Sequence, residues 1–150
     1  MILAVDTSAL LFRYAAGRHS DLVLRAMKRR DTWVISELAI TELHVALHRL
    51  AMNPQQHDLL SASARRDLEC FYTVPVDSRC LVEAAEIAEN YQLTTSHGIH
   101  LAAASRLGQD VGYLTLADAQ FGPAEDIGLE LAIRTRSERS PDRTAATLTP

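Results

Sequence analysis

The sequence predicts an α/β domain built on a parallel β-sheet. Short runs rich in Val, Ile, Tyr and Leu recur without polar alternation, which is typical of strands covered by helices on both faces. Longer helical stretches separate these runs, and strands that alternate with helices favour a parallel sheet with right-handed crossovers. A chain of 150 residues that is 47% hydrophobic and 23% charged suits a single folded domain.

The apolar runs define a sheet of four or five strands. They are bounded by polar or turn-forming residues and are too short for helices. The predicted strands lie at Ile2–Asp6, Thr32–Ser36, Tyr72–Val76 and Gly112–Thr115, with a weaker fifth at Glu130–Ile133.

The helices are predicted between these strands. Pro54 closes the longest one, and Gly108 ends the last because glycine is a common helix terminator. The predicted helices lie at Leu22–Lys28, Glu37–Met52, His57–Cys70, Leu81–Asn90 and Gly98–Leu107.

The domain is expected to span residues 1–133, because the composition changes after that point. "RTRSERSPDRTAATLTP", residues 134–150, has almost nothing apolar to bury and is predicted to be a disordered tail. The amino terminus lacks the pattern of a signal peptide, and no apolar run approaches the roughly 20 residues that cross a bilayer. We therefore expect a cytoplasmic protein with no membrane partner.

Asp6 interrupts the apolar stretch "ILAVDTSALL" where the first strand ends. In open α/β sheets, ligands bind beyond the carboxyl ends of the strands, so this position suits a functional carboxylate. Aspartate is also among the best residues for capping a helix at its amino end. Both interpretations remain open for Asp6 alone.

Two more acids are expected near Asp6. Glu42 lies roughly 60° around its helix from the apolar position Ala39, at the edge of the buried stripe, although a surface position is the alternative. Asp118 follows the strand at Gly112–Thr115, where an ordinary turn aspartate is the alternative. Clustered carboxylates repel each other, and a divalent cation such as Mg²⁺ or Mn²⁺ removes that penalty.

A histidine pair on the same helix suggests a different site. His44 and His48 have the i,i+4 spacing that can bind zinc. They fall roughly 140° and 180° from Ala39, nearly opposite Glu42, so they cannot join its site. We expect both to lie on the solvated face of the helix.

Four blocks in this order and spacing resemble the signature blocks of the PIN domain: "VDTSALL", "ISELAITELHVAL", "SHGIHLAAASRLG" and "YLTLADAQFG". More narrowly, they resemble VapC-type toxins of bacterial toxin–antitoxin pairs, over about residues 2–133. The resemblance implies a three-layer α/β/α sandwich and a magnesium- or manganese-dependent endoribonuclease. It implies that Asp6, Glu42 and Asp118 are the catalytic, metal-binding acids, and that the partners are an RNA substrate, a cognate antitoxin and a second copy of the chain.

His97 departs from the family pattern, in which a fourth acid usually opens the helix matched by "SHGIHLAAA". A neutral imidazole can still bind a metal such as manganese or a metal-bound water, so His97 is kept as a catalytic candidate. The alternative is a degenerate PIN-like protein that binds RNA or an antitoxin without cleaving. His100, one turn later, is expected to serve mainly in packing and ranks below His97.

An acidic chain, with a net charge of −4, still needs local groups that bind RNA. Ser8 and Thr115 are candidates because they flank the expected acids. Arg13 and the run "RAMKRR" at residues 25–30 are candidates for contacts with the phosphate backbone. A helix-start serine, a loop threonine and solvated surface cations are the structural alternatives.

Overall fold

The computed structural model describes residues 1–133, so the predicted tail at 134–150 lies outside the described residues. Five strands form one all-parallel sheet in the order β3-β2-β1-β4-β5. They are β1 (Ile2–Val5), β2 (Thr32–Ser36), β3 (Tyr72–Val74), β4 (Gly112–Leu114) and β5 (Glu130–Leu131). All five predicted strands are present, and the weakest prediction, the fifth, is confirmed as a two-residue strand paired with β4.

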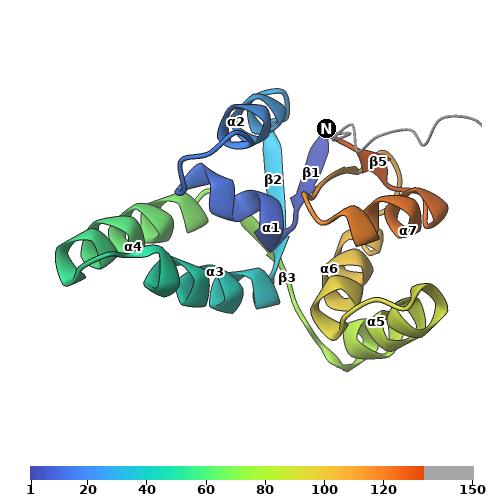
Figure 1. Ribbon diagram of the computed structural model, residues 1–150. Helices are drawn as coiled ribbons and strands as arrows, with labels where there is room; N and C mark the ends of the chain where they lie inside the picture. Colours follow the sequence, from blue (N-terminus) through green and yellow to red (C-terminus); the bar gives the residue numbers. More distant parts are fainter. Residues whose placement is uncertain (134–150) are drawn as a thin grey trace, which may run out of the picture.

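The helices cover the sheet on both sides, which confirms the predicted three-layer α/β/α architecture (Figure 1). On one side lie α1 (Thr7–Leu10), η1 (Leu11–Arg13), α2 (Ser20–Lys28), α3 (Glu37–Leu50) and α4 (Pro54–Leu68). On the other lie α5 (Ser78–Tyr91), α6 (Thr95–Ser105) and α7 (Phe121–Asp126), with η2 (Asp118–Gln120) leading into α7. None of these helices within residues 1–133 is long and apolar enough to cross a membrane.

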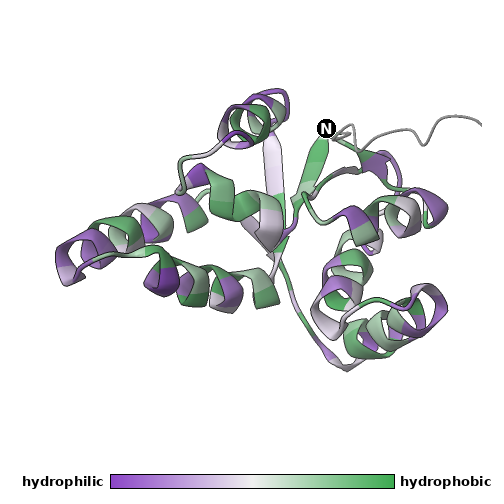
Figure 2. Cartoon of the chain, viewed as in Figure 1, coloured by the Kyte–Doolittle hydropathy of each residue, from purple (hydrophilic) through white to green (hydrophobic). Residues whose placement is uncertain are grey.

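The alternation of side chains along β1 explains the layers. Leu3 and Val5 pack with α1–α4, whereas Ala4 packs with α6 and α7. Figure 2 shows β1 as hydrophobic, while the helices carry both hydrophobic and hydrophilic residues. β3 departs from the prediction of burial on both faces, because it is an edge strand and its Tyr72 is exposed.

Side-chain caps place the helix starts earlier than predicted. Asn53 caps α4 and Pro54 occupies the first helical turn, so Pro54 opens this helix and does not close the preceding one. Asp77 caps α5, and Thr94 caps α6 by accepting a hydrogen bond from the backbone of His97. The short helix α7 was not predicted from the sequence.

Gly98 allows α6 to pack closely against α5. A Cβ atom at this position would lie 2.5 Å from the carbonyl oxygen of Ala84 and 3.1 Å from the Cβ of Ala88. The Ala84 carbonyl belongs to the backbone of a packed helix and cannot move aside as the end of a flexible side chain could. Position 98 therefore requires glycine. This contact sets the depth of α6, and with it the positions of His97 and His100.

Gly98→Ala should therefore lower the free energy of unfolding by about 1–3 kcal/mol, through overpacking between α5 and α6. Gly122→Ala is the matched control, because nothing lies within 4 Å of a Cβ at that helical position. The control should be neutral or slightly stabilising, since alanine favours helix. Urea denaturation measures both, and equal stabilities for the two variants would contradict the packing argument.

Candidate active site

The candidate site lies at the carboxyl ends of the three central strands. Asp6 follows β1, Ser36 ends β2, and Thr115 follows β4. β1 is followed in the chain by α1, α2 and then β2, which pairs with it on one side, while β4 pairs with it on the other. The chain connections therefore leave the sheet in opposite directions at this position, where ligands bind in open α/β sheets. A cavity of about 390 Å³ opens here, lined by Asp6, Thr7, Ser8, Thr41, Glu42, Val45, Ala46, Arg49, Ser96, His97 and His100.

Asp6 is buried, with 2% of its surface exposed, and its two carboxylate oxygens have different surroundings. Oδ2 accepts hydrogen bonds from the backbone N–H and the hydroxyl of Ser8 and from the Thr115 hydroxyl. Oδ1 lies 3.6 Å from His100 Nε2. Asp6 therefore caps α1 and also lines the cavity, so its capping role is confirmed and its functional role stays a prediction.

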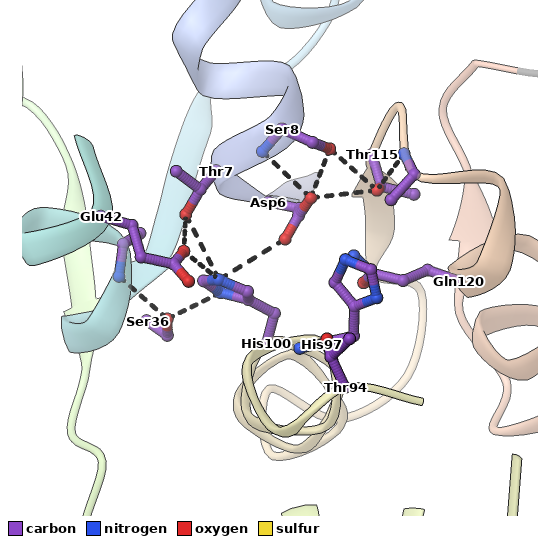
Figure 3. A network of polar contacts seen from close by, with 12 residues as sticks. Asp6, Thr7, Ser8, Ser36, Glu42, Thr94, His97, His100, Thr115 and Gln120 are labelled. Carbon is purple, nitrogen blue, oxygen red and sulfur yellow. Dashed lines mark hydrogen bonds and ion pairs between the residues drawn. The ribbon is translucent and has the colours of Figure 1, made fainter. Parts of the chain in front are cut away.

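Ser8 and Thr115 orient Asp6 and tie α1 to the end of β4. Each hydroxyl donates to Asp6, and each accepts a backbone N–H, from Leu116 at 3.0 Å and Ala117 at 3.1 Å respectively. Through these hydrogen bonds, Ser8 and Thr115 hold the Asp6 carboxylate in one orientation (Figure 3). Their predicted contact with substrate is not needed to explain their positions.

Glu42 reaches the same place from α3. Its Oε2 accepts a hydrogen bond from the Thr7 hydroxyl at 2.5 Å and lies 2.7 Å from His100 Nε2. Burial raises the pKa of Glu42, but hydrogen bonds from His100, Thr7 and Ser96 outweigh burial and bring the pKa below its ordinary value. Glu42 is therefore held as a carboxylate at the edge of the cavity, as the helical stripe predicted.

His100 connects the two acids, so the expectation that it serves mainly in packing missed its polar contacts. Its imidazole is 3% exposed, with Nε2 between Glu42 and Asp6 and Nδ1 2.9 Å from the hydroxyl of Ser36. Burial lowers the pKa of His100, but the hydrogen bond to Glu42 and the charges of Asp6 and Glu42 outweigh burial and raise the pKa. Figure 3 shows the ring at the centre of this network, and the sequence analysis ranked it below His97.

His97 lines the cavity in the first turn of α6, where the sequence placed it. It is partly exposed, and within residues 1–133 its side chain makes no hydrogen bond. Thr94, two residues before Ser96, provides the cap of the helix. The imidazole of His97 is therefore available to a ligand in the cavity.

Asp118 is not brought to the other acids. It begins η2 on the surface, does not line the cavity, and its side chain makes no hydrogen bond or ion pair with any residue in 1–133. No group of three or more His, Cys, Asp or Glu in this part of the chain is arranged to hold a metal ion. The predicted three-acid metal site is therefore not assembled here, because η2 turns Asp118 outward after the buried Thr115.

The remaining pair of acids still fits a hard divalent cation. Asp6 and Glu42 supply carboxylate oxygens beside one cavity, and Mg²⁺ commonly binds one or two carboxylates while keeping several waters. The histidine pair on α3 does not contribute, as expected. His44 Nδ1 contacts its own helix at Ile40, and the His48 ring packs edge-on against His57.

The basic residues predicted to bind RNA lie elsewhere. The Arg13 guanidinium donates to Asp67 at 2.7 Å and lies over the Trp33 ring, so its role in the structure is to join η1 to α4 and β2. The run at residues 25–30 leads to the amino end of β2, the edge of the sheet opposite the site. Within that run, Arg30 contacts Glu130 at 3.4 Å.

The sequence model of the PIN domain family matches residues 3–121. The chain belongs to the PIN domain family. PIN domains are generally nucleases, and buried Asp6 and half-buried Glu42, at the carboxyl edge of the sheet, are the part of this PIN domain suited to such chemistry. No match is found among curated proteins.

Solved structures share the fold at low sequence identity. FitAcB from Neisseria gonorrhoeae has a TM-score of 0.70 at 18% identity, covering 88% of this chain and 98% of that one. A toxin–antitoxin complex from Klebsiella pneumoniae has a TM-score of 0.62 at 18% identity, covering 80% and 91%. VapBC2 from Rickettsia felis, bound to a promoter DNA fragment, has a TM-score of 0.60 at 16% identity, covering 87% and 98%.

His100→Ala should lower the free energy of unfolding by about 2–4 kcal/mol, because it leaves two carboxylates without their shared partner. His44→Ala is the control, since His44 is exposed and contacts only its own helix. The control should change stability by less than about 0.5 kcal/mol. Chemical denaturation without metal measures both, and a His100 variant as stable as the control would contradict the bridging role.

Arg13→Gln tests the ion pair with Asp67. The hydrogen bond from Arg13 is the largest cause that lowers the pKa of Asp67, so the stabilisation is present above the ordinary aspartate pKa of about 3.9 and is lost as the pH falls through the lowered value. The free energy of unfolding of the variant should be about 1 kcal/mol lower than that of the native chain at pH 7. This difference in stability should shrink below about pH 4.

Arg25→Gln is the control for Arg13, because Arg25 is exposed and has no ion pair within the described chain. Denaturation over a pH series gives the comparison. A stability difference for Arg13→Gln that stays constant down to pH 2 would show that the Asp67 charge is not its cause.

Proposed function

We propose that this PIN domain is a divalent-metal-dependent endoribonuclease that acts as the toxin of a toxin–antitoxin pair. The observation that carries the proposal is the convergence of Asp6 and Glu42 on one cavity, with His100 within 3.6 Å of the first and 2.7 Å of the second. Two fixed carboxylates in an open cavity suit an ion, Mg²⁺ or Mn²⁺, that also binds substrate phosphate. The structural similarity to the toxin–antitoxin complex from Klebsiella pneumoniae supports the assignment to this class.

The residues of the chain would have separate tasks in the reaction. Asp6 and Glu42 would hold the cation, Ser8 and Thr115 keep the Asp6 carboxylate in one orientation, and His100 contacts the Glu42 carboxylate. When bound, the cation supplies an activated water and neutralises the charge that develops on the phosphate. The imidazole of His97 faces the same cavity and would hydrogen-bond to water or phosphate there.

The partners follow from the same proposal. RNA is the substrate, a cognate antitoxin is the inhibitor, and a second copy of the chain completes a homodimer. The structural neighbours described as toxin–antitoxin complexes support the antitoxin partner. The degenerate, non-cleaving PIN-like protein remains the second candidate, because His97 and the outward position of Asp118 both reduce the number of acids at the site.

Cleavage assays on the acid variants test the proposal. The native chain should cleave structured RNA with Mg²⁺ or Mn²⁺ and stop with EDTA. Asp6→Asn and Glu42→Gln should each lower the rate by about 100-fold or more, because metal-centred stabilisation is worth several kcal/mol. Asp118→Asn should lower it by less than about 10-fold, since this acid lies outside the cavity.

His97→Asp separates the two candidates. A native chain that cleaves, with the aspartate variant within about 10-fold of it, supports the nuclease. Cleavage by the His97→Asp variant alone would identify the native chain as a degenerate site. Circular dichroism should show that each variant is folded before its rate is compared.

A further inference from the structure

The active-site cavity continues along α3 beyond Glu42. Val45, Ala46 and Arg49 follow at intervals of three, four and seven residues, which places them on the same face of the helix, and all line the cavity with Glu42. At about 1.5 Å per residue, Arg49 begins roughly 10 Å further along the helix than Glu42. The cavity is therefore longer than the pair of acids alone requires.

Arg49 gives the outer end of this cavity a positive charge. It is exposed, and its side chain makes no ion pair or hydrogen bond with any residue in 1–133, unlike those of Arg13, Arg30, Arg79 and Arg106. The residues that line the cavity include no lysine and no other arginine. A guanidinium without a protein partner suits bidentate binding of a phosphate group.

Val45 provides an apolar surface between the two charged ends. Its side chain is 45% exposed, although valine is more often buried, and Ala46 lies beside it. An apolar patch of this size is suited to packing against a ribose or a base. The order along α3 is therefore carboxylate, apolar surface, guanidinium, which matches the alternation of phosphate and nucleoside in an RNA strand.

We propose that Arg49 and Val45 form a subsite for the nucleotide next to the scissile phosphate, with the guanidinium bound to the neighbouring phosphate. This rests on the proposed nuclease function, since the scissile phosphate is placed at Asp6 and Glu42. RNA is favoured over an acidic peptide because the subsite is continuous with the cavity that holds those two acids. Arg49 is a substrate-binding residue in this account and takes no part in the chemical step.

Binding of a fluorescent RNA oligonucleotide to the full chain in EDTA tests the subsite without requiring cleavage. Arg49→Gln should raise the Kd by about 5–30-fold and reduce the slope of log Kd against log salt by about 0.7, the value for one phosphate of a single strand. Val45→Ser should raise the Kd by about 3-fold with an unchanged slope, because its contact is uncharged. Arg65→Gln is the matched control, since Arg65 is exposed on α4, makes no ion pair and does not line the cavity.

Cleavage with Mg²⁺ provides a second readout. Arg49→Gln should raise KM with little change in kcat, while Arg65→Gln should match the native chain. If the native chain cleaves and the two arginine variants behave alike, the subsite is wrong and the nuclease proposal stands. If the native chain binds RNA through Arg49 but does not cleave, Arg49 is still an RNA-phosphate contact, whereas the nuclease proposal and the placement beside a scissile phosphate both fail.

Binding of a fluorescent acidic peptide in the same assay tests the alternative ligand. Weaker peptide binding by Arg49→Gln, with RNA binding unchanged, would overturn the RNA assignment.

Discussion

The arrangement of the site depends on the contact between His100 and the carboxylates of Asp6 and Glu42. One imidazole, buried at the carboxyl edge of the sheet, contacts Glu42 through Nε2 and Ser36 through Nδ1, with Asp6 3.6 Å away. Without a positive partner, two acids brought this close would repel each other and resist burial. The raised pKa of His100 and the lowered pKa of Glu42 have this shared cause.

Several residues at this edge serve both the fold and the site. Asp6 caps α1 and Ser36 caps α3, and each also contributes its side chain to the network around His100. Gly98 lets α6 approach α5 closely enough for His100 to occupy its place. A substitution at any of these positions should therefore change folding and activity together, whereas exposed residues of the cavity such as Arg49 can change binding alone.

The sequence was sufficient for the five strands and for the five longer helices between them, apart from their starts, because each depends on local patterns of apolar residues. The helical position of Glu42 and the strand-end position of Asp6 were predicted for the same reason. His100 was underestimated because its partners Ser36 and Glu42 lie 64 and 58 residues away, and a buried polar network leaves no periodic signal. Arg49 was missed because its proposed role in binding substrate depends on the tertiary structure, which places it in the same cavity as Glu42 and Val45.

Asp118 and Arg13 show the limit of reasoning from neighbours in the chain. Asp118 follows a strand that ends at the site, yet the loop at 115–117 leads it to an exposed position in η2. Arg13 follows the first motif closely, yet Asp67, 54 residues away, binds its guanidinium. Both outcomes were decided by tertiary contacts or loop direction, which short motifs do not encode.

The central claim, that the two acids joined by His100 form the cation site, is tested most directly by anomalous diffraction from a crystal soaked in Mn²⁺. We expect a manganese peak in contact with the carboxylates of Asp6 and Glu42. A peak at Asp118 alone or on the exposed histidines of α3, with none at this pair, would contradict it.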